Sequence, residues 1–349
     1  MTIEPVQMIV SGHELSISNP NKVFFPARGD TKLDLINFYL SIEEPLMRAM
    51  RDRPVLLQRF PNGTTGSSFF QKRIPDSAPE WLQTTVVSTP NGTLSNALVI
   101  ADVAHVIWAV NLGCLGFHSW PVRASQPEIT DELRIDLDPG PGTTFAMAQE
   151  TAHETRLLFD ELGLTSYIKT TGNRGLHVYV RLLAMWNSMH VRAAAVVMAR
   201  ELERRRPDLI TAAWWKEERG ARIFIDFNQN APHKTVFAPW SVRARDHAPV
   251  SCPFPWDELD TIHPDALTIA TVPARLAAHG DPWEAIDRTP NSLEPLLQLA
   301  ARDVAAGLAD APWPPQYPKM EGEPLRVAPS RAKKTPAPPA DTGHVDSDM

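Results

Sequence analysis

The stretch Glu132–Pro139, ELRIDLDP, decides the fold class, because its alternating pattern predicts a β-strand with two chemically different faces. Successive side chains of a strand point to opposite faces, so the aliphatic residues share one face and Arg134, Asp136 and Asp138 share the other. Two carboxylates on one face repel each other, and proteins keep such a pair where a cation or a shared proton is expected. The alternative is a solvated strand end whose last aspartate initiates the Pro-Gly-Pro-Gly turn that follows. This stretch alone leaves both interpretations open.

The segments that follow alternate between helix and strand patterns. Residues 145–163 predict a helix closed by Gly163, residues 166–183 predict two strands around a glycine-containing turn, and residues 189–207 and 221–228 predict a second helix and a third strand. The order β, α, ββ, α, β is that of the split βαβ, ferredoxin-like arrangement. The sequence therefore predicts an α+β fold.

A third acid, Asp226, interrupts the apolar alternation of residues 221–228 as Asp136 and Asp138 interrupt theirs. Three aspartates on strands of one sheet could hold two divalent cations, the arrangement used for in-line phosphoryl transfer. Carboxylates suit hard cations such as Mg²⁺ and Mn²⁺, and Cys114 and Cys252 are too few for a thiolate zinc site, so we expect no zinc. These carboxylates alone also fit a metal-dependent phosphoesterase.

Charge is distributed unevenly along the 349 residues, whose net charge is −7. Residues 165–245 carry 14 basic and 6 acidic side chains, whereas residues 101–164 carry 3 and 10. Because the local field decides whether phosphate is attracted, this pairing suits a site for metal ions and nucleotide phosphates. A solvated basic helix around RELERRRP, residues 200–207, would explain part of the excess.

The segment TTGNRGLHV, residues 170–178, adds hydrogen-bond donors around a turn. Its glycines allow close backbone approach to an anion, Thr171 offers a hydroxyl, Arg174 a cation, and His177 lies on the polar face of its strand. The spacing is not that of a Walker loop, and for the segment taken alone a tight β-turn is the better explanation. A structural histidine and a surface arginine are likewise the simple interpretations of His118 and Arg243.

Taken together and in order, FHSWP (117–121), DLDPGPG (136–142), TTGNRGLHVYV (170–180) and FIDFNQNAPHKTVFAPWSVRAR (224–245) strongly resemble the polymerase domain of bacterial ligase D. This family is a branch of the archaeo-eukaryotic primase superfamily, and the resemblance spans roughly residues 5 to 300. It implies an RRM-like catalytic sheet packed against an N-terminal α/β module, with the active site in the cleft between them. The implied boundaries are about residues 1–115 for the N-terminal module and 116–300 for the catalytic module.

The resemblance also implies roles for individual residues. Asp136, Asp138 and Asp226 would be the catalytic acids and metal ligands. The incoming nucleotide would be held by His118, Thr171, Gly172, Arg174, His177, Lys234 and Arg243. DNA would be contacted by Lys22 and Lys32 in a pocket for a downstream 5′-phosphate (NPNKVFFP and DTK), by Arg59, and by Phe69 and Phe70 of SSFFQKR stacking on template bases. A buried core pair is the simpler interpretation of the two phenylalanines.

The family commonly has serine at position 171, a small residue and lysine at positions 173 and 174, and a basic residue at position 58. This chain has Thr171, Asn173, Arg174 and Gln58 there. The hydroxyl and the positive charge are kept, so the resemblance still implies activity, whereas the phosphate contact at 173–174 and one template contact at 58 are in question.

The function implied is a template-directed polymerase that adds nucleotides, ribonucleotides readily, to a primer 3′-hydroxyl and fills short gaps in DNA repair such as end joining. Two Mn²⁺ or Mg²⁺ ions would be the cofactors. Gapped or broken DNA with a 5′-phosphate and nucleoside triphosphates would be the substrates, with a separate DNA ligase and Ku as partners. The alternatives are a primase that starts chains without a primer and a catalytically silent module that bridges DNA ends.

Other features of the sequence predict where the protein is located and which further domains it has. We expect a cytoplasmic, nucleoid-associated protein without a membrane partner, because there is no long apolar run and no signal-like N-terminus. No ligase or nuclease region follows residue 300, which indicates a stand-alone polymerase. Residues 301–349 are proline-rich, and we expect disorder beyond about residue 318.

Overall fold

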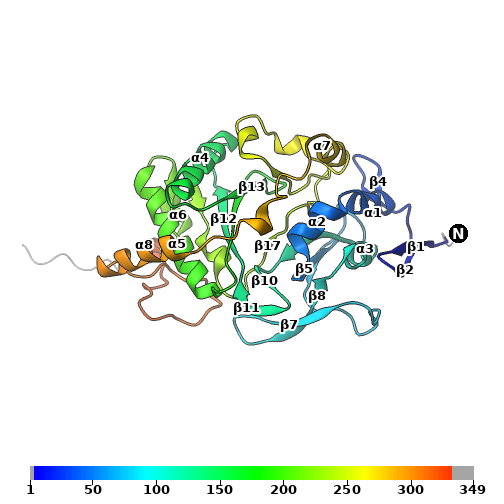
Figure 1. Ribbon diagram of the computed structural model, residues 1–349, viewed down its shortest axis with the longest axis horizontal. Coiled ribbons are helices and arrows are strands. Elements are labelled where there is room, and N and C mark those ends of the chain that lie inside the picture. Colours follow the sequence, from blue (N-terminus) through cyan, green and yellow to red (C-terminus); the bar gives the residue numbers. More distant parts are fainter. Residues whose placement is uncertain (1–3, 332–349) are drawn as a thin grey trace, which may run out of the picture.

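Two mixed modules, each built around a six-stranded sheet, make up the computed structural model, which describes residues 4–331 (Figure 1). The first sheet has the strand order β17-β9-β5-β8-β7, with β6 paired to β5. The second has the order β15-β16-β12-β14-β13-β18. Among the residues described, no helix is long and apolar enough to cross a membrane.

The first module comprises β5 (Arg53–Arg59), β6 (Phe69–Gln71), β7 (Thr84–Ser88), β8 (Leu94–Ile100), β9 (Cys114–Ser119) and β17 (Val236–Phe237), with α1 (Lys32–Ser41), α2 (Glu43–Met50) and α3 (Val103–Asn111). Two-stranded ribbons accompany it: β1 (Val6–Val10) with β2 (His13–Ile17), β3 (Val23–Phe25) with β4 (Asp30–Thr31), and β10 (Val122–Arg123) with β11 (Gln126–Thr130). A capping box starts α1, because the Thr31 hydroxyl accepts from the Asp34 amide and the Asp34 carboxylate accepts from the Thr31 amide.

The second module comprises β12 (Glu132–Pro139), β13 (Tyr167–Thr170), β14 (Leu176–Arg181), β15 (Ile210–Thr211), β16 (Ile223–Ile225) and β18 (Pro253–Phe254), with α4 (Phe145–Glu161), α5 (Ser188–Arg205), α6 (Lys216–Arg219) and the 3-10 turn η1 (Phe227–Asn230). Along the chain, β12, α4, β13, β14, α5 and β16 reproduce the predicted ferredoxin-like order, and the four strands lie side by side as β16-β12-β14-β13. Thr144 and Asn187 cap α4 and α5 with their side chains.

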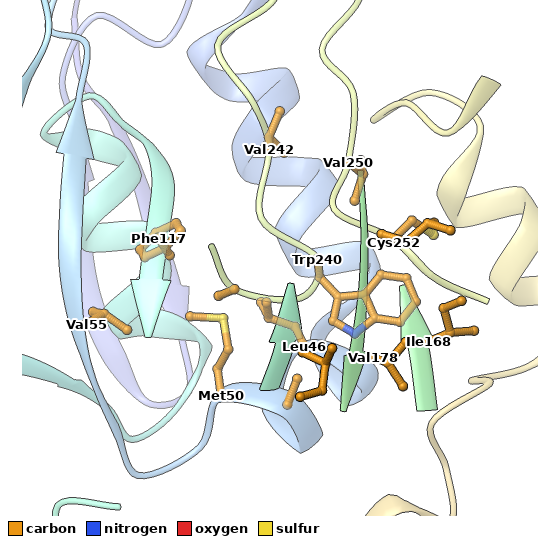
Figure 2. Packing of buried hydrophobic residues seen from close by; sticks show 14 of the residues in the cluster. Leu46, Met50, Val55, Phe117, Ile168, Val178, Trp240, Val242, Val250 and Cys252 are labelled. Carbon is orange, nitrogen blue, oxygen red and sulfur yellow. The ribbon is translucent and has the colours of Figure 1, made fainter. Parts of the chain in front are cut away.

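The remaining elements are η2 (Trp256–Glu258), η3 (Pro264–Ala266), α7 (Val272–His279), η4 (Ile286–Arg288), α8 (Glu294–Ala305) and η5 (Pro329–Arg331). A shared apolar core joins the modules; Figure 2 shows Trp240 between Met50 and Phe117 of the first module and Ile168 and Val178 of the second. The two modules are thus one packed unit.

A buried ion cluster also crosses from one sheet to the other. The guanidinium of Arg53 on β5 is fully buried, and it donates to Asp131 Oδ1 at 2.8 Å and to Glu132 Oε1 at 2.6 Å. Arg134 donates to Glu132 Oε2 and to the Ser119 carbonyl on β9. Each buried charge therefore has an opposite charge beside it, as such groups require.

The expected boundaries differ from the observed layout at two places. The module boundary near residue 115 cuts β9, which pairs with β5 and belongs to the first sheet. β17 also pairs in the first sheet, although its residues fall within the range expected for the catalytic module. Residues 319–331, where we expected disorder, have defined contacts: the Glu323 carboxylate is buried and accepts from Trp313 N at 2.7 Å. Residues 332–349 lie outside the described part.

Candidate active site

Two of the three predicted acids, Asp136 and Asp226, share a hydrogen-bond donor where β12 and β16 meet, and Asp138 is close enough for its charge to raise the pKa of Asp226. These strands are antiparallel neighbours with Asp138 opposite Phe224, and the Asp226 amide donates to the Asp136 carbonyl at 3.0 Å. The side-chain amide nitrogen of Gln229, on the following turn η1, lies 3.0 Å from Asp226 Oδ2 and 3.5 Å from Asp136 Oδ2. The carboxylates of Asp136 on β12 and of Asp226 are therefore within reach of one donor atom. Asp226 lies just beyond β16 as the cap of η1, not within the third strand as predicted.

Burial and mutual repulsion make these carboxylates unusually weak acids. Burial, with a lesser contribution from the charge of Asp136, raises the pKa of Asp226 to about 7, while the charge of Lys234 opposes that rise. Burial also raises the pKa of Asp136 to about 6, against the positive charges of Lys169 and Arg243. The pKa of Asp138 is raised by burial and by Asp136, although its side chain is the most exposed of the three. Burial is thus the main reason why these carboxylates hold their protons more tightly than usual.

This donor set fits hard divalent cations in its chemistry, although the side chains do not yet form a closed cage. Within residues 4–331, no three His, Cys, Asp or Glu side chains are gathered closely enough to hold a metal ion. Asp226 Oδ1 accepts from the Asn228 amide as the cap of η1, and its other oxygen accepts from Gln229. A bound cation would take the place of the Gln229 side-chain N–H group, which Asp136 and Asp226 share as a hydrogen-bond donor.

A row of polar side chains crosses the second sheet from Asp136. His177 on β14 lies opposite Asp136, with its Nε2 atom 3.2 Å from Asp136 Oδ1, and Lys169 on β13 lies opposite His177. Lys169 is completely buried and donates to Ser251 Oγ at 2.5 Å. Burial lowers the pKa of Lys169 well below its usual value and, together with the charge of Lys169, lowers that of His177. In this structure His177 therefore contacts Asp136, with Nδ1 buried and lacking a partner among the described residues.

His118 lies on β9 of the first sheet and faces the same junction. Its ring meets Phe70 edge-on at 5.4 Å and Phe237 at 5.1 Å between centroids. Burial, reinforced by the charges of Arg243 and Lys169, lowers its pKa to about 3, so the imidazole is neutral. Its Nε2 atom is buried with no hydrogen-bond partner among residues 4–331. Such an atom marks a place for a ligand, because an unpaired buried polar group is costly.

The turn at residues 170–178 packs against Arg243. Thr171 Oγ1 accepts from the amides of Asn173 and Gly175, and the Thr171 carbonyl accepts from Arg243 Nε at 2.9 Å. Gly172 has a φ of 68°, and a Cβ there would come within 2.9 Å of Arg243 Cγ, so only glycine fits. Residues 170–178 therefore form the tight turn that the sequence favoured, and they also line the site beside Arg243.

The other predicted nucleotide contacts lie around the acids. Arg174 is exposed and its charge acts on Asp138, whereas Lys234 is partly exposed and its charge acts on Asp226. The sequence reasoning missed three residues: Gln229, Lys169 and Arg219 on α6, whose charge acts on Asp138 and Asp226. Of these three, only Lys169 could have been found from the sequence, because it lies two residues before Thr171 and alternation places both side chains on the same face.

The aromatic pair lies on the edge of the first sheet, beside His118. Phe69 and Phe70 on β6 are 47% and 58% exposed, which excludes the core-pair interpretation. Arg59 stacks over Phe69 at 5.2 Å and donates to the Leu112 carbonyl, so it braces the pair. Two solvent-facing rings beside His118 are suited to stacking on bases.

The two predicted phosphate-binding lysines are neighbours at the start of α1. Lys22 is partly exposed and donates to Asn62 Oδ1 at 2.9 Å and to the Pro61 carbonyl. Lys32 is only 4% exposed and donates to the carbonyls of Ser18 and Asn111, and burial lowers its pKa to about 8. Lys22 is therefore available to an anion, whereas Lys32 anchors the surrounding backbone.

A ferredoxin-like sheet carrying paired acids, joined to a second sheet with exposed aromatic rings, defines a protein built for nucleotides and nucleic acid. The sequence model of the family described as "LigD, primase-polymerase domain" matches residues 31–283. The chain belongs to this family.

Relatives agree with that assignment. The multifunctional non-homologous end joining protein LigD of Mycolicibacterium smegmatis is 35% identical over 267 residues, which are 76% of this chain and 35% of that protein. The bifunctional LigD of Bacillus subtilis is 30% identical, over 82% of this chain and 46% of that protein. The polymerase domain of Mycobacterium tuberculosis ligase D, solved in complex with DNA, superposes with a TM-score of 0.74 at 30% identity, covering 79% of this chain and 99% of that one. This chain thus spans about a third to a half of these curated relatives.

Proposed function

We propose that this protein is a metal-dependent nucleotidyltransferase that extends a primer 3′-hydroxyl along a DNA template during break repair. The observation that carries the proposal is the convergence of Asp136 and Asp226 on the amide nitrogen of Gln229. Asp138 projects from the same face of β12 as Asp136, at the open end of the strand. The end joining relatives and the polymerase domain solved with DNA support the same activity.

Asp136, Asp138 and Asp226 would hold two divalent cations, with Mn²⁺ preferred. When bound, such ions lower the pKa of the attacking hydroxyl and neutralise the charge on the leaving pyrophosphate. This chain supplies no side-chain nucleophile in this scheme. Its carboxylates must be ionised to accept the cations, which their raised pKa values make sensitive to pH.

The remaining residues of the site would bind and orient the triphosphate. Neutral His118 would contact the triphosphate through Nε2, which has no competing partner among the described residues, and the Arg243 guanidinium is held against the Phe237 ring at 3.4 Å. Lys234 and Arg174 add positive charge on either side of the acids. Donors held in place before the reaction stabilise the developing charge without reorganisation.

DNA would approach across the first sheet. Phe69 and Phe70 would stack on template bases, and Lys22 would contact a downstream 5′-phosphate. The preferred substrate would be a short gap with a 5′-phosphate, filled with ribonucleotides as readily as with deoxyribonucleotides. A separate DNA ligase and Ku are the partners we propose, at broken chromosomal DNA in the cytoplasm.

The test is extension of matched gapped, nicked and primer-free templates with Mn²⁺ and each nucleotide type. We expect template-directed addition on the gapped substrate, strongest when the gap carries a 5′-phosphate. Dinucleotide products without a primer would instead identify a primase. Tight DNA binding without incorporation on any template would identify an end-bridging module and reject the proposal.

A further inference from the structure

A C-terminal strap, residues 309–331, lies beyond the part of the chain that the family model matches. It runs from α8 across α5 to α6. Its first contact is a buried cluster around Arg192 of α5, whose Nη1 donates to both oxygens of Asp310 at 3.0 and 3.1 Å and whose Nη2 donates to the Ala311 carbonyl at 2.8 Å. The Arg192 guanidinium also stacks over Trp313 at 3.8 Å from the ring centroid.

The same arginine connects the strap to the turn that carries the third acid. Arg192 Nε donates to Asn228 Oδ1 at 2.9 Å, and Asn228 Nδ2 donates to the Pro312 carbonyl at 3.0 Å. The Asn228 amide in turn donates to Asp226 Oδ1 at 3.1 Å. Arg192 and Asn228 are each 2% exposed, so neither exchanges these partners for water. A continuous chain of buried hydrogen bonds therefore runs from the strap to a catalytic carboxylate.

Two further contacts secure the strap on both sides of that carboxylate. The Tyr317 hydroxyl donates to the Pro232 carbonyl, and Trp313 and Tyr317 pack on Ala231 immediately after η1. At the far end, the Ser330 amide donates to Glu217 Oε1 at 2.9 Å on α6, the helix that carries Arg219. The strap thus touches η1, which follows Asp226, and α6, which precedes β16.

We propose that the strap is a positioning element for the active site: it acts through Arg192 and Asn228 to hold η1, and with it Asp226 and Gln229, in the geometry that binds the cations. The effect of the strap on cation binding and catalysis rests on the proposed function. The restraint of η1 by the strap does not rest on it, because that restraint is a property of the metal-free protein. Gln229 belongs to the same four-residue turn, so loosening η1 would move the carboxylate and its amide donor together.

The experiment compares Asp310→Ala with Leu325→Ala in the full-length protein. Asp310 is bound bidentately by Arg192, whereas the Leu325 side chain is 73% exposed on the same strap and serves as the matched control. Amide hydrogen exchange is measured without metal for residues 226–232 and, as an internal reference, for β9. Mn²⁺ binding is measured by electron paramagnetic resonance, and binding to gapped DNA by fluorescence anisotropy.

In Asp310→Ala we expect amide exchange in residues 226–232 to accelerate about tenfold or more and the Mn²⁺ dissociation constant to rise about fivefold or more. The reason is that Arg192 loses its charge-assisted hydrogen bonds to Asp310. β9 exchange and DNA binding should stay within twofold of wild type, and Leu325→Ala should match wild type throughout. Arg192→Lys, which keeps the charge but not the fork of donors, should repeat the Asp310→Ala result.

The proposal is overturned if folded Asp310→Ala leaves residues 226–232 and Mn²⁺ affinity within twofold of wild type. Equal acceleration of β9 would reveal a general loss of stability and also overturn it. If neither Asp310→Ala nor Arg192→Lys folds, the strap is part of the core and the proposal is rejected. A wild type that binds Mn²⁺ but incorporates no nucleotide would refute the proposed function while leaving these readouts intact.

Discussion

Replacing Asp226 with asparagine should make the metal-free protein more stable at pH 8 while removing its Mn²⁺ binding. In the folded protein the pKa of Asp226 is about 7, against an ordinary value of 3.8. Since the folded state holds this proton more tightly than the unfolded chain, ionisation costs folding free energy. That cost appears as the pH rises above about 4 and is complete once the pH exceeds about 7.

The size of the effect follows from the pKa difference. About three pKa units at about 1.36 kcal/mol each give an upper limit of about 4 kcal/mol. Asparagine still accepts from the Asn228 amide, but its NH₂ group opposes the amide of Gln229, which costs about 1 kcal/mol before Gln229 turns over. We therefore expect a net gain of about 1–3 kcal/mol at pH 8, falling toward zero or reversing at pH 4.

The assay is urea unfolding in EDTA, followed by tryptophan fluorescence at pH 8 and pH 4. Asp257→Asn is the matched control, because Asp257 is exposed and its side chain bonds to no residue within 4–331. Adding Mn²⁺ should stabilise the wild type and not Asp226→Asn. The reasoning is refuted if Asp226→Asn is less stable than wild type at pH 8, or if the difference between them does not change with pH.

Four further outcomes are expected. Asp136→Asn should lower Mn²⁺-dependent incorporation by a factor of about 10³ or more with DNA binding within twofold of wild type; residual activity near that of the wild type in an extension assay would contradict it. Mn²⁺ affinity, measured calorimetrically, should fall about 20-fold from pH 8 to pH 6, because at pH 6 Asp226 is mostly protonated and Asp136, with a pKa of about 6, is half protonated; a flat profile would disagree. Phe70→Ala should weaken binding to gapped DNA by about 1–3 kcal/mol in anisotropy titrations, and Lys22→Ala should lower the preference for a 5′-phosphate without changing affinity for unphosphorylated DNA.

The periodic parts of this chain were predictable because their signals are local. The alternation in Glu132–Pro139 placed Asp136 and Asp138 on one face, and the order of helices and strands after them is the one that the structure has. The solvent exposure of a side chain was not predictable in this way. Phe69 and Phe70 face solvent, although phenylalanine is as common in a buried core. Periodicity reports which residues share a face, not what covers that face.

Long-range pairing was also beyond local reasoning. β17 joins the first sheet after strands β12 to β16 of the second sheet have intervened, and so brings Phe237 against His118. Lys32 illustrates the same limit, since its ammonium is held by Ser18 and Asn111 rather than open to a phosphate.

By itself the sequence determined the α+β class, the order of the catalytic strands and the identity of the three acids, because side-chain alternation and turn residues act over a few positions. Only the tertiary structure decided that Gln229 bridges Asp136 and Asp226, that Lys169 is buried beside His177, and that residues 309–331 fold back onto η1. Each of these depends on desolvation and on contacts between segments distant in sequence, whose free energies no local pattern encodes.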